Sequence, residues 1–213
     1  MNHHYDPRLI LPPQMPAFPP FVSFANVLSP PECDALSQLA EVRGLSSGAI
    51  GNDGGESVVN VDYRKVETSQ LLPSDRVSGE RIDWLFERIR DKVMWANANH
   101  FRFDIYGLWQ QINYLKYLAP KTEGEVPGHY DSHQDFGGGE SSQRKLSVVI
   151  QLSNPADYDG CRLLLHTEKE FDPGHVQQGD MIVFPSWCVH RVTNITRGER
   201  RALVSWVSGP QFR

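Results

Sequence analysis

Hydrophobic positions divide this chain into an N-terminal part with helical spacing and a C-terminal part of short runs with strand-like spacing. Between residues 82 and 96, apolar positions recur at steps of three and four, which places them on one stripe and predicts a helix. These positions are Ile82, Leu85, Phe86, Ile89, Val93 and Ala96. Another helix is expected from Ser29 to about Val42, because Ser29, the following proline and Glu32 match a capping box. Residues 21–24 are expected to form a short strand.

From about residue 100 onward, runs of aliphatic, aromatic and β-branched residues alternate with turn signals. The expected strands are residues 111–118, 146–152, 162–166, 181–184 and 201–207. Glycine, proline and asparagine clusters between them are typical of turns. Many short strands joined by turns predict a sandwich or jelly roll, with the earlier helices packed on one outer face. The predicted fold class is therefore mainly β with flanking helices.

The chain, residues 1–213, is expected to be a single domain, because its length suits one sizeable core and it shows no internal repeat. Residues 1–20 are rich in proline and are expected to be an extended arm. Residues 21–100 would give helical support, and residues 101–213 would form the strand core. Two glycine-rich loops, residues 48–55 and 137–139, are candidate lids, although plain surface loops have the same composition.

Composition and charge exclude several classes of protein. The net charge of −5 argues against a nucleic-acid-binding protein, which usually carries a basic patch. No apolar run approaches the roughly 18 residues that a membrane span needs, and the N-terminus lacks the pattern of a secretory signal. Three widely spaced cysteines argue against a disulfide framework and favour a reducing, cytoplasmic location. The oligomeric state is not indicated.

Two overlapping His-x-Asp pairs, His129 with Asp131 and His133 with Asp135, are the main candidates for chemistry. On a strand, residues two apart point the same way, and His190 from a distant strand would complete a two-histidine, one-carboxylate triad. Such a triad is typical of non-haem Fe(II) oxygenases. If residues 129–135 form one extended strand, the two pairs lie about 13 Å apart on the same face. One metal cannot use both pairs, and spacing alone does not choose between them.

From about residue 95 to its end, the chain resembles the iron(II)/2-oxoglutarate dioxygenases of the prolyl 4-hydroxylase-like, PKHD-type hydroxylase group. The group carries its first two metal ligands in a Tyr-Asp-Trp-His-x-Asp stretch, which stands here as Tyr130-Asp131-Ser132-His133-Gln134-Asp135. Ser132 departs from the tryptophan that is usual in the group. The other matching segments are residues 144–147, 157–160, 183–186, 190–193 and 197–200.

The resemblance implies that Fe(II) is bound by His133, Asp135 and His190 rather than by the other pair. It also implies a double-stranded β-helix (a jelly roll, cupin-like), with 2-oxoglutarate and O2 as co-substrates and ascorbate as a reductant. The implied reaction hydroxylates a C–H bond and releases succinate and CO2. The implied substrate is a prolyl peptide, a free amino acid or another small metabolite.

Arg200 enters the last expected strand, where alternation directs Arg200, Ala202, Val204 and Trp206 to one face. An arginine on a buried face needs an anion, and the distal carboxylate of 2-oxoglutarate would supply one. Arg201 would point the other way and be the exposed neighbour. The family counterpart of Tyr117 lies beside the co-substrate, so its hydroxyl is a second candidate contact.

Other residues near these motifs have two interpretations. Cys188 would share a strand face with His190 but is interpreted as a small buried hydrophobe. Ser147 and Trp206 are weaker candidates for the cavity lining, and Trp187 is either a pocket wall or a packing residue.

Two alternatives to the hydroxylase remain open. A cupin-like protein would bind metal without redox chemistry, as an isomerase or a sugar-binding module. A partner-binding scaffold would keep only a vestigial site. Arg64 and Lys65 would either attract an anionic substrate or be solvated surface residues.

Overall fold

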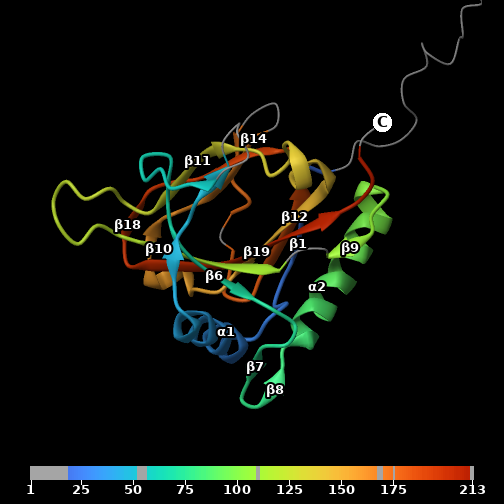
Figure 1. Ribbon diagram of the computed structural model, residues 1–213, viewed down its shortest axis with the longest axis horizontal. Helices are drawn as coiled ribbons and strands as arrows, with labels where there is room; N and C mark the ends of the chain where they lie inside the picture. Colours follow the sequence, from blue (N-terminus) through green and yellow to red (C-terminus); the bar gives the residue numbers. More distant parts are fainter. Residues whose placement is uncertain (1–18, 52–56, 109–110, 167–169, 175, 212–213) are drawn as a thin grey trace, which may run out of the picture.

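The computed structural model describes residues 19–51, 57–108, 111–166, 170–174 and 176–211 (Figure 1). Nearly all of the expected proline-rich arm, residues 1–20, therefore lies outside the described residues. The described residues also do not include residues 52–55 of the first glycine-rich loop, or His3, His4 and His175.

Both predicted helices are confirmed. Helix α1 spans Pro30–Arg43, and the carboxylate of Glu32 accepts a hydrogen bond of 2.8 Å from the backbone N–H of Ser29. Helix α2 spans Asp83–Ala96 and continues into one π-helical turn, Asn97–Phe101. The buried residues of α2 repeat at the predicted three- and four-residue steps: Leu85, Ile89, Val93 and Ala96. In the part of the chain that the structure describes, neither helix combines the length and apolar character of a membrane span.

The larger sheet is antiparallel and has eight strands. Its order is β1 (Val22–Phe24), β16 (Met181–Pro185), β12 (Arg144–Gln151), β19 (Glu199–Ser208), β10 (Ile112–Leu118), β6 (Glu67–Leu71) and β2 (Ser46–Ser47). Strand β9 (Gly107–Leu108) also pairs with β19. The segment 21–100, expected to give helical support, thus also contributes strands β1, β2 and β6 to this sheet.

The smaller sheet has five antiparallel strands. Its order is β15 (Glu170–Phe171), β14 (Leu163–His166), β17 (Val189–Val192), β11 (His129–His133) and β5 (Arg64–Lys65). Three separate strand pairs are β13 (Asp159–Gly160) with β18 (Ile195–Arg197), β3 (Ile50–Gly51) with β4 (Ser57–Val58), and β7 (Arg76–Val77) with β8 (Glu80–Arg81). Two 3-10 turns span Gly139–Gln143 and Pro155–Asp157.

Alternation along the larger sheet builds a separate apolar core on each of its faces. On β10, Ile112 and Tyr114 belong to a core shared with α1 and α2, whereas Leu115 and Tyr117 belong to a core shared with the smaller sheet. The helices therefore cover one face of the larger sheet and the smaller sheet covers the other (Figure 1). This arrangement confirms the predicted mainly β jelly roll with flanking helices.

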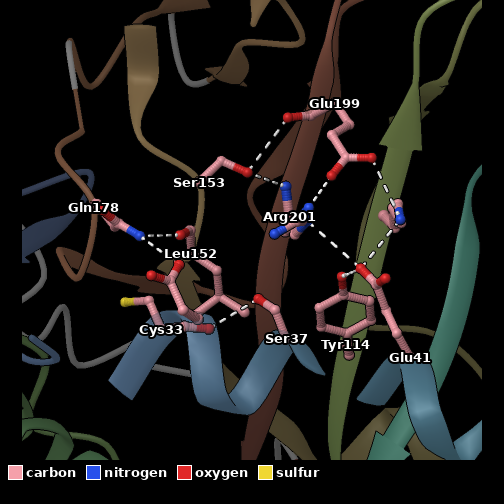
Figure 2. A network of polar contacts seen from close by, with 11 residues as sticks. Cys33, Ser37, Glu41, Tyr114, Leu152, Ser153, Gln178, Glu199 and Arg201 are labelled. Carbon is pink, nitrogen blue, oxygen red and sulfur yellow. Dashed lines mark hydrogen bonds and ion pairs between the residues drawn. The ribbon is translucent and has the colours of Figure 1, made fainter. Parts of the chain in front are cut away.

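Polar contacts centred on Glu41 fix α1 to the larger sheet (Figure 2). The Glu41 carboxylate accepts hydrogen bonds from the Tyr114 hydroxyl at 2.8 Å and from Lys116 Nζ at 3.1 Å. Arg201 Nε lies 3.5 Å from the same carboxylate, and Arg201 also pairs with Glu199. Arg201, expected to be an exposed neighbour of Arg200, is therefore half-buried and attached to the helix side of the sheet.

Candidate functional site

The centre of the site lies where strands β11 and β17 of the smaller sheet run side by side. His133 on β11 is the direct antiparallel partner of His190 on β17. Strand β11 ends at His133, and the next residues turn so that the backbone N–H of Asp135 donates to the carbonyl of Ser186 at 3.0 Å. As a result, donor atoms of His133, Asp135 and His190 all lie within 4.8 Å of one another.

The other His-x-Asp pair does not reach this cluster. The pairing register of β11 shifts between Tyr130 and His133, so residues 129–135 do not form the single extended strand on which both pairs would share one face. His129 is buried, with its ring nitrogens 2.9 Å from the carbonyl of Pro127 and 3.0 Å from that of Asp62. Asp131 is exposed. The shift thus separates the two pairs in space.

Backbone carbonyls orient both histidines of the cluster. Nδ1 of His133 lies 2.7 Å from the carbonyl of Asp131, and Nδ1 of His190 lies 2.9 Å from that of Cys188. A carbonyl only accepts, so each Nδ1 carries the proton and each Nε2 keeps a free lone pair. The two Nε2 atoms lie 3.9 Å and 3.6 Å from the oxygens of Asp135. Two oriented imidazole lone pairs and a carboxylate are a donor set that suits Fe(II).

The charge state of the cluster also suits a metal ion. Burial and the neighbouring His190 lower the pKa of His133, which keeps its imidazole neutral near pH 7. Burial alone would raise the pKa of Asp135, but His190, His133 and the hydroxyl of Ser147 together hold it below its usual range. Ser147 Oγ donates a hydrogen bond of 2.6 Å to this carboxylate. Ionised carboxylate and neutral imidazole are the forms that bind metals.

Aromatic rings pack against both imidazoles. The ring of Tyr130 stacks on that of His133, with centroids 3.5 Å apart and planes at 16°. The ring of Phe184 meets that of His190 edge-on at 4.9 Å. On the same Tyr130 ring, the guanidinium of Arg64 lies 4.5 Å from the centroid. These contacts limit the rotation of the donor side chains.

The cluster opens into a cavity of about 910 Å³ between the two sheets. Its lining includes the four residues that alternation assigned to one face of the last strand: Arg200, Ala202, Val204 and Trp206. It also includes Arg64, Tyr117 and Arg144. The sequence prediction of which β19 side chains face inward is therefore confirmed.

Arg200 is buried deep in this cavity, only 6% exposed. Its Nε donates to Gln151 Oε1 at 3.0 Å, and its guanidinium lies 5.9 Å from the ring of Tyr117, its partner across β10 and β19. Among the described residues, no carboxylate lies within ion-pair distance of Arg200. Burial raises the pKa of Tyr117, so its hydroxyl stays a neutral hydrogen-bond donor. A buried, charged guanidinium without an acidic partner is a suitable binding group for an anionic ligand.

The remaining candidates have different surroundings. The thiol of Cys188 lies 3.4 Å from the carbonyl of His166 and outside the donor cluster. Trp187 packs edge-on against Phe103 at 5.0 Å. Ser132, at the position of the usual tryptophan, is exposed. All three cysteines are buried free thiols.

The sequence did not predict that Arg64 and Arg144 would lie in the same cavity. Both guanidinium groups contact aromatic rings there. Arg144 lies 3.7 Å over the ring of Trp206, and Arg64 lies over Tyr130. Arg144 occurs in one of the segments that carry the resemblance. The sequence indicates Arg64 only as a charge that follows a glycine-rich loop.

Comparisons with known proteins agree with this geometry. A family model described as the 2OG-Fe(II) oxygenase superfamily matches residues 110–208. A PKHD-type hydroxylase of Hyphomonas neptunium is 35% identical over 158 residues, 72% of this chain and 65% of that protein. Another, of Synechococcus sp., is 35% identical over 92 residues, 43% of this chain and 41% of that protein. The matches therefore span less than two thirds of the length of these two relatives.

A solved structure shows the same fold. It is a prolyl hydroxylase from Trichoplax adhaerens in complex with a peptide fragment of the hypoxia inducible factor oxygen degradation domain. The TM-score is 0.67 at 19% sequence identity, and the match covers 89% of this chain and 84% of that chain. At this identity the likeness concerns the arrangement of strands and helices.

Proposed function

We propose that this chain is an Fe(II)- and 2-oxoglutarate-dependent hydroxylase of the 2OG-Fe(II) oxygenase superfamily, whose family model matches residues 110–208. One observation carries the proposal: three side chains of metal-ligand type converge in the cavity that also contains a buried arginine, Arg200, which has no carboxylate partner among the described residues. The metal-ligand side chains alone, or the buried arginine alone, would also suit a protein of another class. Together they suit a metal ion that is chelated by an oxo-acid whose far carboxylate binds the arginine.

In this proposal His133, Asp135 and His190 hold Fe(II). Bound Fe(II) would couple the oxidative decarboxylation of 2-oxoglutarate by O2, which yields succinate and CO2, to hydroxylation of a substrate C–H bond. Three protein ligands leave positions open for small molecules. The protein's own share is orientation: the carbonyls of Asp131 and Cys188 direct the imidazoles, and Ser147 directs the carboxylate.

Arg200 would bind the distal carboxylate of 2-oxoglutarate. Gln151 fixes the guanidinium through Nε and is itself held, since its amide donates to the carbonyl of Ser153 and to the hydroxyl of Tyr158, each at 3.0 Å. The neutral hydroxyl of Tyr117 would donate a further hydrogen bond. A non-redox cupin-like protein would have no use for a buried cation at this position, so the arginine favours the hydroxylase.

The proposed substrate class is a prolyl peptide, a free amino acid or a small metabolite. The peptide is supported by the Trichoplax adhaerens prolyl hydroxylase, whose structure contains a peptide fragment. A cavity of about 910 Å³ has room for the co-substrate and a substrate side chain together.

The test is succinate formation by purified protein with Fe(II), 2-oxoglutarate, O2 and ascorbate, and with each omitted in turn. Turnover should require Fe(II) and O2, and His133→Ala or His190→Ala should abolish it. His100→Ala, a histidine on the π-helical turn outside the cavity, is the matched control and should retain activity. Normal turnover in His133→Ala together with loss in His129→Ala would transfer the metal to the other pair.

A further inference from the structure

The cavity carries an excess of positive charge in a protein whose net charge is −5. Its charged lining residues are Arg64, Arg144, Arg200 and a single acid, Asp135. In the loaded site, the two positive charges of Fe(II) and the charge of Arg200 are cancelled by Asp135 and by the two carboxylates of 2-oxoglutarate. The charge of Arg64 then remains, and a cavity with low-dielectric walls concentrates its attraction for an anion.

Arg64 is held in place but has no acidic partner in the part of the chain that the structure describes. Its Nη1 donates to the carbonyl of Ala49 at 2.6 Å, and its guanidinium lies over the ring of Tyr130. Its Nε is buried without a hydrogen-bond acceptor among the described residues, and none of their carboxylates lies within ion-pair distance of it. Gly48 packs so closely that an added methyl group there would lie 3.1 Å from this Nε. A guanidinium on an aromatic face keeps its charge and presents its edge to a carboxylate.

The neighbouring cations differ from Arg64. Nζ of Lys65 lies 2.9 Å from the carboxylate of Glu125 and 2.6 Å from the carbonyl of Val126, so its charge is compensated. Arg144 donates to the carbonyl of Asp135 at 3.2 Å and is also attracted by the carboxylates of Asp135 and Glu140. Arg64 is therefore the cation best placed to accept a new anion, with Arg144 adding charge to the same cavity.

We propose that the substrate of this enzyme carries a carboxylate and that Arg64 binds it, beside the Tyr130 ring that stacks on His133. The inference rests on the proposed function and narrows its substrate class. The carboxylate has two sources, the α-carboxylate of a free amino acid or an acidic side chain of a peptide. Both present the same planar oxyanion to the guanidinium.

The experiment compares matched acids and amides. Wild-type protein with Fe(II), ascorbate and 2-oxoglutarate is offered free amino acids including proline, the corresponding amino acid amides, prolyl peptides with a flanking Asp or Glu, and the same peptides with Asn or Gln. Stimulation of succinate release and hydroxylated product are measured. The amino acids or peptides that carry a carboxylate should stimulate succinate release, and the corresponding amides should not. The free amino acid and peptide arms identify the source of the carboxylate.

The variant Arg64→Gln should raise the KM for the stimulating acid by roughly 10- to 100-fold, the range for loss of a charge-assisted hydrogen bond. The KM for 2-oxoglutarate should not change. Arg64→Lys keeps the charge but not the planar pair of N–H donors, so its KM for the stimulating acid should lie between those of wild type and Arg64→Gln. Arg90→Gln, an equal change of charge on the exposed side of α2, is the control and should behave as wild type.

Failure of the inference is distinguishable from failure of the proposed function. Anaerobic binding of 2-oxoglutarate to the Fe(II) protein, followed by its visible absorption, is measured in every variant. If that binding is intact but amides stimulate as well as acids, or no acid stimulates, or Arg64→Gln leaves the KM for the acid unchanged, the inference is overturned. If wild-type protein does not bind 2-oxoglutarate, the proposed function is overturned and the inference with it. The acid and amide comparison in wild type needs no variant to fold.

Discussion

His133 on β11 and His190 on β17 are direct partners across two antiparallel strands, and their ring centroids lie 4.1 Å apart. Neighbouring strands fix their backbones, and the two Nδ1 contacts to carbonyls fix their rings. A bivalent cation would therefore meet donors that need little rearrangement, and metal binding should stabilise the folded protein.

We expect Fe(II), added without oxygen at about 100 times its dissociation constant, to stabilise the fold by about 2.7 kcal/mol. For a chain of this size, that free energy corresponds to a rise in Tm of roughly 5–10 °C. Thermal unfolding followed by fluorescence measures the shift. His190→Ala should lose it and His100→Ala should keep it. An equal shift in wild type and His190→Ala would place the metal elsewhere.

Ser147→Ala should weaken Fe(II) binding by roughly 10-fold, because groups that orient metal ligands typically contribute at this level. The change removes the 2.6 Å hydrogen bond to Asp135 while leaving all three donor side chains. Competition titration with a chelator measures the affinity. Ser186→Ala is the matched control, since Ser186 Oγ lies 3.0 Å from Ser147 Oγ and should have the smaller effect. Unchanged affinity in Ser147→Ala would contradict the role given to this hydroxyl.

Arg200→Ala should raise the KM for 2-oxoglutarate by roughly 100-fold, since it removes a charge-assisted contact. Gln151→Leu, which removes only the partner of Arg200 Nε, should have a smaller effect in the same direction. Steady-state kinetics and anaerobic titration of 2-oxoglutarate measure both changes. Fe(II) affinity should be unaffected in each variant. A variant of Arg200 that binds 2-oxoglutarate as wild type does would exclude the proposed contact.

Glu41→Gln should destabilise the protein at neutral pH but not in acid. Burial tends to raise the pKa of Glu41, but hydrogen bonds from Tyr114 and Lys116 outweigh it and lower the pKa in the folded state. A lowered folded pKa stabilises the fold above the usual glutamate pKa of about 4.3. That contribution is lost as pH falls through the folded value.

Because the Glu41 side chain is 34% exposed, we expect the difference in unfolding free energy to be only about 1 kcal/mol at pH 7. Denaturant unfolding between pH 3 and pH 7 measures it. High salt should reduce the difference. Glu80→Gln, on the exposed strand β8, is a control with no ion pair among the described contacts. A difference that grows towards pH 3 would contradict the sign of the effect.

The sequence predicts those features that depend on local periodicity. The stripe of α2 and the inward row from Arg200 to Trp206 follow from repeat distances along one segment, and both are confirmed. The separation of the two His-x-Asp pairs depends on a register shift against β17, which no local pattern signals. Spacing therefore left the pairs equivalent, and only the resemblance chose between them.

The position of Arg64 in the cavity could not be predicted from the residues near it in the sequence either. Strand β5 has two residues and is defined by its pairing with His129 and Tyr130 on β11. Its place in the cavity thus depends on partners about 65 residues away in the sequence. A short pairing of this kind, formed only in the folded protein, brings Arg64 into the cavity lining.

Glu199, Arg200 and Arg201 are consecutive on β19, and their alternating side chains serve the helix α1 on one face and the cavity on the other. Inserting or deleting one residue within this strand would exchange the faces. Arg201 would then enter the cavity while Arg200 pointed at helix α1, so the contacts of Arg201 to Glu41 and the proposed binding of 2-oxoglutarate by Arg200 would both be lost. Homologues should consequently vary in length in the turn before residue 199 and hardly ever inside the strand.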